Sequence, residues 1–162
     1  GKKITLPKNI FAVKDYDKIT FYKTFEKGKP NEQIIFETPF ALGEYEFAGK
    51  KYKFEIVGND SAKNGDNRLI ADLLKIPDTA VLRNRKGGDV FRKFGGGTKK
   101  LKDYLIDKKV PSRERDKLLL LADGANVLII CGIEISDAIK VDKTTRNVLQ
   151  CTLSDMCKQH DN

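Results

Sequence analysis

The sequence predicts an α+β fold that is rich in β-strands and organised as two small modules. Apolar and polar residues alternate at strand spacing through the first third of the chain, as in "KITFYKTF" at 18–25. Short apolar runs bounded by turn residues fill the last third, and only the stretch between them shows helical spacing. A length of 162 residues fits one domain or two small ones. No apolar run approaches the ~18 residues that a membrane span requires, so we expect no membrane segment.

The first module, residues 1–67, is predicted to consist of strands and turns. Two short β-rich pieces flank Pro7, and "EYEFAGKKYKFEIV" at 44–57 alternates on both sides of Gly49, which indicates a hairpin. The polar residues at 58–67 predict a loop, so we place the module boundary after residue 67. Because the sequence starts with glycine rather than methionine, we expect it to begin inside a longer chain.

The second module, residues 68–162, is predicted to combine strands with two short helices. Strands are expected at 68–74, 80–85, 118–136 (a hairpin with an Asp-Gly turn) and 144–153. The "KGGD" at 86–89 predicts a turn between the second of these strands and the helical stretch.

The two helices are expected between the glycines at 95–97 and the hairpin. Thr98 is a suitable N-cap for the first helix, which must end before Pro111. Its apolar face would be formed by Leu101, Tyr104 and Leu105. Ser112 is a suitable N-cap for the second helix. The predicted second domain therefore has two short helices packed on antiparallel strands.

The glycines at 95–97 resemble a phosphate-binding loop only in part. A P-loop requires GxxxxGK[ST] and a dinucleotide site requires GxGxxG, and both patterns are absent. A helix that begins here would still offer free backbone N–H groups and its positive dipole end, with Lys99 and Lys100 adding charge. We therefore expect this stretch to hold a backbone phosphate of nucleic acid. A purely structural turn and a small-anion site are the alternatives, and Gly96 or Gly97 should have a positive φ.

Positive charge is concentrated in one segment. Residues 81–117 contain 13 basic and 5 acidic residues, so this segment carries all of the net charge of +8. A field of this kind is typical of a surface that binds a polyanion, and a solvated lysine-rich surface is the alternative. The arginines favour the first interpretation, because the guanidinium group matches phosphate geometry.

Eight residues of this segment are our candidates for RNA contacts. Arg83 and Arg85 could instead form a salt bridge with Asp89, and Arg115 could pair with Asp89 or Asp116. The two lysines at the predicted helix start could be solvated helix charges. The tRNA-binding candidates are Arg83, Arg85, Arg92, Lys99, Lys100, Lys102, Arg113 and Arg115.

The sequence contains few residues that could form a catalytic or metal-binding site. The three cysteines, Cys131, Cys151 and Cys157, are an odd number without CxxC spacing, which favours a reduced protein over a disulfide scaffold or a zinc site. Cys131 lies in an apolar run and is expected to be a small core residue. The single histidine, His160, lies in the polar tail. We therefore predict no catalytic residue and no metal ligand.

Four motifs occur in order over about 81–150. They are the R-x-R-x-x-GD turn at 83–89, "GGTKKLKDYLIDKKVP" at 96–111, "RERD" at 113–116 and "GIEIS" at 132–136. In this order and spacing they resemble the C-terminal domain of the tRNA(Ile)-lysidine synthetase family. The β block before them resembles the module that precedes this domain in the longer members.

This resemblance implies a fold and a function. The fold would be a PheT/TilS-like domain, similar to one in a phenylalanyl-tRNA synthetase β subunit. The family attaches lysine to cytidine 34 of tRNA(Ile) with a CAU anticodon, in an ATP-dependent reaction. Its catalytic domain carries an SGGxDS loop, which is absent from this sequence. The chain would therefore be a tRNA-binding region that recognises the acceptor stem, with no cofactor of its own, because ATP would bind in the catalytic domain.

The resemblance also implies a cytoplasmic protein that acts in tRNA modification and does not bind a membrane. Whether the protein is a monomer or a homodimer is left undecided by the sequence. A second hypothesis, independent of the resemblance, is a protein-interaction or oligomerisation module whose basic face meets an acidic partner. That alternative predicts an apolar patch beside the charges.

Overall fold

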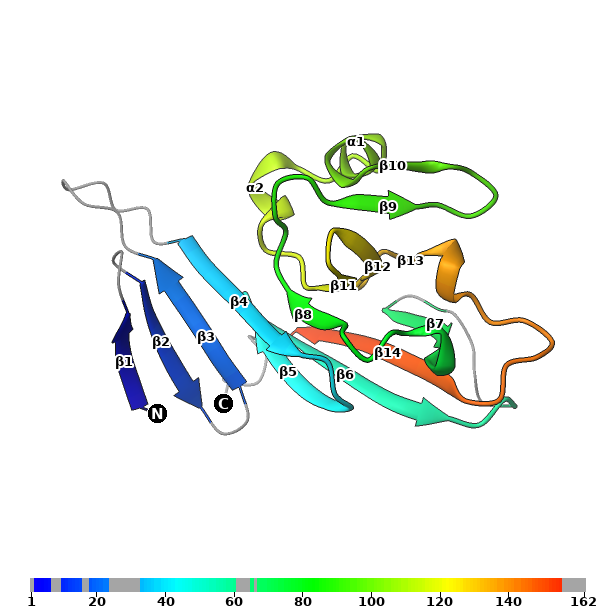
Figure 1. Ribbon diagram of the computed structural model, residues 1–162, viewed down its shortest axis with the longest axis horizontal. Helices are drawn as coiled ribbons and strands as arrows, with labels where there is room; N and C mark the ends of the chain where they lie inside the picture. The colour runs from blue at the N-terminus through cyan, green and yellow to red at the C-terminus, as the bar shows by residue number, and fades with distance from the viewer. Residues whose placement is uncertain are drawn as a thin grey trace.

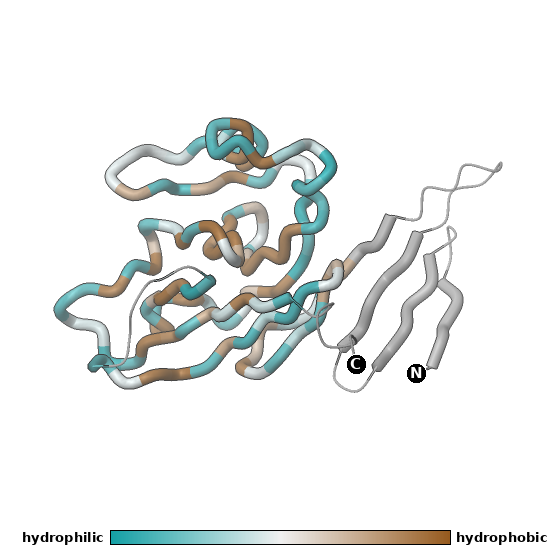
Figure 2. The backbone as a smooth tube through the Cα atoms, turned by 180° about the vertical axis from the view of Figure 1, so that it is seen from behind, coloured by the Kyte–Doolittle hydropathy of each residue, from teal (hydrophilic) through white to brown (hydrophobic). Residues whose placement is uncertain are grey.

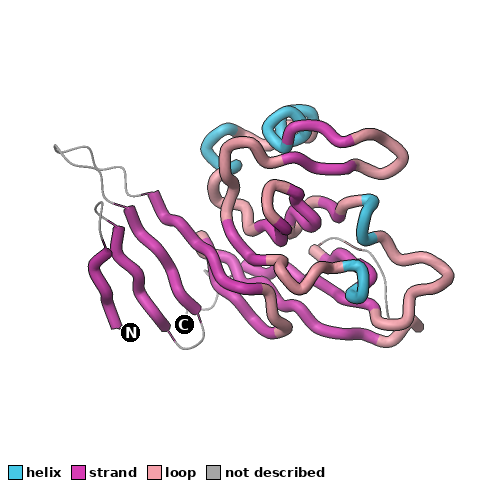
Figure 3. Tube along the Cα trace, viewed as in Figure 1, coloured by secondary structure: helices cyan, strands magenta, loops and turns pink. Residues whose placement is uncertain are grey.

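β-Strands make up most of the protein in its computed structural model. The structure describes the backbone of residues 2–6, 10–15, 18–23, 33–60, 65 and 67–155, and the side chains of 36–60, 65 and 67–155. The helices are short and lie at the periphery of the strands (Figure 3). The β-rich class is therefore confirmed. Cys157, His160 and much of the loop predicted at 58–67 lie outside the described residues.

The elements follow one another with short connections. The strands are β1 (Lys2–Leu6), β2 (Ile10–Asp15), β3 (Lys18–Lys23), β4 (Gln33–Pro39), β5 (Gly43–Phe47), β6 (Lys50–Val57), β7 (Arg68–Asp72), β8 (Val81–Arg83), β9 (Val90–Arg92), β10 (Thr98–Lys100), β11 (Leu120–Asp123), β12 (Asn126–Ile130), β13 (Glu134–Ile135) and β14 (Val148–Asp155). The α-helices are α1 (Leu101–Asp107) and α2 (Ser112–Arg115), and the 3-10 helices are η1 (Leu73–Lys75) and η2 (Asp137–Ile139).

Within the described residues, the larger sheet contains ten strands, β1–β4 and β8–β13. Its strand order is β1-β2-β3-β4-β8-β11-β12-β9-β10, and β13 also pairs with β12. Neighbouring strands are antiparallel except for β12 and β9, which run parallel. The β9–β10 hairpin, which carries the glycine stretch, therefore ends the sheet, where α1 lies beside it (Figure 1).

The smaller sheet has the order β5-β6-β14-β7. Its central strand β14 comes from the end of the described chain, and its register runs from Val148 opposite Val57 to Asp155 opposite Lys50. On its other side β14 pairs with β7. The predicted hairpin around Gly49 is confirmed as β5–β6, and its two turn residues, Ala48 and Gly49, both have positive φ.

One hydrophobic core joins the two sheets. Figure 2 shows hydrophobic stretches gathered in the central strands. Among the buried residues of this core are Phe36, Tyr52, Phe54, Leu82, Leu121, Ile129 and Leu149. The core and the smaller sheet thus combine residues from both sides of the boundary predicted after residue 67. The division into modules 1–67 and 68–162 stays a prediction.

A second cluster of buried residues lies beneath α1. The predicted helix face is confirmed, because Leu101, Tyr104 and Leu105 are 1%, 5% and 0% exposed. The ring of Tyr104 packs against Phe91 of β9, with 4.6 Å between the ring centroids. This packing fixes α1 to the sheet through the hairpin that precedes it. The second helix begins at Ser112 itself, and its N-cap is Pro111 rather than the serine.

Two predictions about the glycine stretch are wrong. Thr98 is not a helix N-cap but the first residue of β10, and α1 has Lys100 as its N-cap, without a side-chain capping bond. The positive φ occurs at Gly95, at 64°, and not at Gly96 or Gly97. The physical reason is the same for both errors: the glycines turn one strand back on another, and the helix follows only after the second strand.

Candidate nucleic-acid interface

A groove between the 86–89 turn and the start of α1 gathers four basic side chains. Its volume is about 500 Å³. We call it the basic groove, and its basic residues are Arg85, Lys86, Lys100 and Lys102. Gly87 and Gly88 also line it, and nothing lies within 4 Å of the position that a Cβ atom would take at either residue. Gly88 has φ +88°, a conformation that favours glycine. The backbone of the turn is therefore open to a ligand.

A buried ion pair builds this turn. Arg83 is 2% exposed and Asp89 is 5% exposed, and two hydrogen bonds of 2.9 and 2.8 Å join the guanidinium to the carboxylate. Arg83 also donates to the carbonyl oxygens of Asn84 and Gly124, and Asp89 accepts from the backbone N–H of Lys86. The salt-bridge alternative is the one that the structure contains. The donors of Arg83 that form these bonds are therefore bound inside the protein, and an RNA contact by Arg83 stays a prediction.

The next two cations of the groove have acidic partners at the surface. The guanidinium of Arg85 donates to Asp116 at 3.1 and 3.0 Å, so Asp116 is the partner of Arg85 rather than of Arg115. Lys86 pairs with Glu37 of β4 at 2.7 Å. The side chains of Asp116 and Lys86 are more than half exposed, so solvent screens these pairs and a polyanion can compete for the cations.

Lys100 and Lys102 are the least committed cations of the groove. Both are exposed, and neither forms an ion pair with any residue that the structure describes. Their backbone is held in place because the N–H of Leu101 donates to the carbonyl of Asp89 at 2.9 Å. That bond occupies the first N–H group of the helix, which is one of the groups that the predicted phosphate site would use. The groove, rather than the helix end, is therefore the place where positive charge and open backbone coincide.

Lys99 lies outside the groove. Its ammonium group donates to Asp107 at the end of α1 and thereby connects β10 with the helix. This hydrogen bond, followed by the charge of Lys99 itself, lowers the pKa of Asp107 below its ordinary value. Desolvation opposes this lowering of the pKa, and the charge of nearby Lys93 adds a weaker lowering effect.

The remaining candidates are spread over the surface. Arg92 lies 3.6 Å from Asp137 and borders a different cavity. Arg113 has a side chain that is 84% exposed, and Arg115 donates to the carbonyl of Val110 at 3.0 Å. The structure therefore brings Arg85, Lys100 and Lys102 together and leaves the other candidates elsewhere.

Lys86 is a groove residue that is not among the candidates predicted from the sequence. This residue precedes the two glycines of the turn, and its backbone N–H is bound by Asp89, which directs its side chain to the groove wall. Its position next to a "GGD" turn is a signal that could have identified it.

Other kinds of site have little support among the residues described. These residues contain no group of three or more His, Cys, Asp or Glu side chains that could hold a metal ion. Cys131 is confirmed as a core residue, and burial raises the pKa of its thiol. Within the same part of the chain, no helix is long and apolar enough to cross a membrane.

Comparison with known proteins gives a consistent result. Residues 80–151 match the family model described as TilS substrate C-terminal domain. A tRNA(Ile)-lysidine synthase of Caldanaerobacter subterraneus is 35% identical over 152 residues, which cover 92% of this chain and 32% of that protein. A protein of the same name from Clostridium tetani is 34% identical, covering 93% of this chain and 33% of its own length. The chain thus spans about a third of the length of these relatives.

The fold comparison agrees with the sequence comparison. A solved structure titled "Crystal structure of TILS C-terminal domain" superimposes with a TM-score of 0.64. The match covers 75% of this chain and 98% of that one, at 21% identity. It therefore shows a shared fold.

Proposed function

We propose that this chain, which belongs through residues 80–151 to the TilS substrate C-terminal domain family, binds tRNA with the basic groove. The relatives named tRNA(Ile)-lysidine synthase support tRNA(Ile) as the partner, and we propose that it carries a CAU anticodon. Within the complete enzyme this region would hold the tRNA, while lysine is attached to cytidine 34 in an ATP-dependent reaction elsewhere. The chain itself would bind no ATP, since it lacks the SGGxDS loop.

The observation that carries this proposal is that lysines without a described acidic partner lie beside a glycine turn whose backbone is accessible to a ligand. Lys100 and Lys102 face the same groove as the glycine turn, and no described acid neutralises them. Phosphate oxygens accept hydrogen bonds from lysine ammonium groups and from open backbone N–H groups alike. An A-form stem presents its phosphates and 2′-hydroxyl groups across a wide, shallow minor groove, so recognition there depends on shape and backbone.

Three finer statements belong to the same proposal. The acceptor stem is the part of the tRNA that the groove would contact. The domain would share its PheT-like architecture with a phenylalanyl-tRNA synthetase β subunit. The protein would act in the cytoplasm, where tRNA is modified, and a homodimer remains compatible with it.

The proposal is tested by comparing three polyanions in a binding titration at one salt concentration. We expect transcribed tRNA(Ile) to bind the chain more tightly than a DNA duplex of similar length, and far more tightly than polyglutamate. Polyglutamate stands for the acidic protein partner of the alternative hypothesis. Equal affinity for tRNA and polyglutamate, or no measurable binding of tRNA, would overturn the proposed function.

A further inference from the structure

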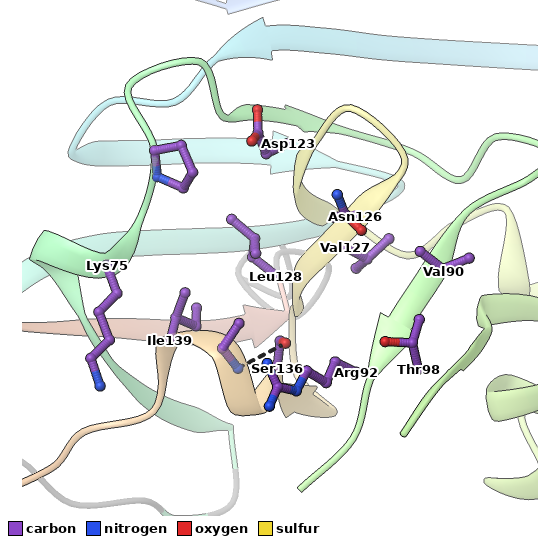
Figure 4. A pocket seen from close by; sticks show the side chains of 12 residues that line it. Lys75, Val90, Arg92, Thr98, Asp123, Asn126, Val127, Leu128, Ser136 and Ile139 are labelled. Carbon is purple, nitrogen blue, oxygen red and sulfur yellow. Dashed lines mark hydrogen bonds between the residues drawn. The ribbon is translucent and has the colours of Figure 1, made fainter. Parts of the chain in front are cut away.

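We propose that a second cavity, adjacent to the basic groove, takes an unpaired nucleotide of the bound RNA, an inference that rests on the proposed function. This side cavity has a volume of about 350 Å³ and lies between the β9–β10 hairpin, β12 and the segment 136–139 (Figure 4). Val90 borders both the side cavity and the basic groove. An RNA strand whose phosphates lie in the groove can therefore extend past β9 into the side cavity.

The floor of the side cavity is apolar. Val127, Leu128 and Ile139 are 1%, 6% and 0% exposed and line it. Such side chains can pack against the flat face of a nucleobase, as aromatic and apolar groups do in sites for single-stranded RNA. The volume lies within the ~300–1,000 Å³ typical of small-ligand pockets, and a base-paired duplex is too wide to enter.

The rim of the side cavity is polar. Thr98 and Asn126 are both exposed, and no described residue forms a hydrogen bond with the Thr98 hydroxyl or the Asn126 side-chain amide. Ser136 also lines the cavity but is only 1% exposed, and its hydroxyl oxygen accepts from the N–H of Ala138 at 3.1 Å. These groups supply the donors and acceptors that a base edge requires.

The charged residues that line the side cavity are Lys75, Arg92 and Asp123, and the carboxylate of Asp123 accepts from the Thr79 hydroxyl at 2.6 Å. Asp137 lies 3.6 Å from Arg92 and 3.0 Å from Lys140, so one carboxylate is shared by two cations. Lys75, on the opposite wall, is committed to Asp142 at 2.7 Å. Arg92 is therefore the residue that can bind the phosphate of a nucleotide whose base lies on the apolar floor.

The test fills the side cavity without changing its charge. Ala138 is exposed and lines the cavity, so Ala138→Tyr should occlude it, and Ala41→Tyr is the matched control on an exposed alanine elsewhere. Thr98→Tyr is a second occluding variant, at a strand position. Melting curves check that each variant folds. The RNAs are a hairpin with short single-stranded extensions at the end of its stem, the same hairpin with abasic extensions, and the blunt hairpin.

We expect wild type to bind the extended hairpin about 5- to 100-fold more tightly than either other RNA, as burial of a base predicts. The folded occluding variants should lose this gain and bind the blunt hairpin as wild type does, while Ala41→Tyr changes neither affinity. The inference would be overturned if the single-stranded extension did not increase the affinity of wild type, or if the occluding variants kept this increase. Either result would leave the proposed function intact. Wild-type protein that binds none of the three RNAs would instead overturn the proposed function.

Discussion

At the residue scale, Arg83 differs from the other cations near the glycine turn because its carboxylate partner is buried. Its two hydrogen bonds to Asp89 lie inside the turn, whereas Arg85, two positions later, reaches a surface carboxylate. Sequence alone could not decide between these roles, because two arginines two positions apart would share one face of a continuous strand. Strand β8 ends at Arg83, and Arg85 follows outside it, so the two side chains reach different partners. Arg83 therefore holds the turn that borders the groove, through its buried bonds to Asp89.

The Arg83→Ala variant should be less stable than wild type, because the carboxylate of Asp89 would remain buried without its partner. We expect a loss of about 3–5 kcal/mol in the free energy of unfolding, measured by urea denaturation. Arg113→Ala, at a side chain that is 84% exposed, is the control and should change stability by no more than about 0.5 kcal/mol. Similar midpoints for Arg83→Ala and wild type would show that the ion pair does not hold the turn.

At the element scale, the β9–β10 hairpin and α1 form one unit that the sequence only partly predicts. The helix face and the strands around it follow from periodicity, since Leu101, Tyr104 and Leu105 are spaced for one face. The three-residue strands do not, because "VFR" and "TKK" are too short to show a period and are defined by their pairing with each other. A glycine run before a helix is therefore compatible with either a helix cap or a hairpin turn, and only the pairing of the flanking strands distinguishes them.

The backbone of the β9–β10 hairpin predicts that substitutions at neighbouring glycines reduce the stability of the protein by different amounts. Gly95→Val should destabilise the protein by about 1–2 kcal/mol, because φ at this position is +64° and a β-branched residue is strained there. Gly97→Val, where φ is not positive and open space surrounds the Cβ position, should have little effect. Thermal melting of the two variants measures the difference, and equal melting temperatures would contradict this assignment of the turn.

The contact between Lys99 and Asp107 should make the hairpin–helix unit sensitive to acid. The pKa of Asp107 is lower in the folded protein than in the unfolded chain, so its contribution to stability is present above the ordinary carboxyl pKa. It is lost as the pH falls through the folded-state pKa. Wild type should therefore melt above Asp107→Asn at pH 7, and this difference should disappear in acid. Asp78→Asn, at an exposed carboxylate elsewhere, is the control; a difference between wild type and Asp107→Asn that persists in acid would contradict the prediction.

At the scale of the whole molecule, the sequence predicts which strands exist better than it predicts how they pair. The hairpins around Gly49 and Gly124 are local and were predicted, whereas the insertion of β14 between β6 and β7 joins residues far apart in the chain. The charge map locates the basic segment, but acids from outside it, such as Glu37 and Asp137, pair with some of its cations. The candidate site is therefore smaller than the charged segment, and it depends on long-range packing.

If the basic groove binds RNA phosphates, as we propose, the affinity for tRNA must depend on salt concentration through the groove lysines. Each phosphate that the protein neutralises releases counterions, so affinity falls with rising salt. We expect Lys100→Ala/Lys102→Ala to reduce the slope of log affinity against log salt by about 2 units relative to wild type, roughly one per lysine. The control Lys53→Ala/Lys143→Ala removes the same charge from exposed positions outside the groove and should keep the wild-type slope. Identical slopes for wild type and the groove variant, or an equal reduction in the control, would contradict the account.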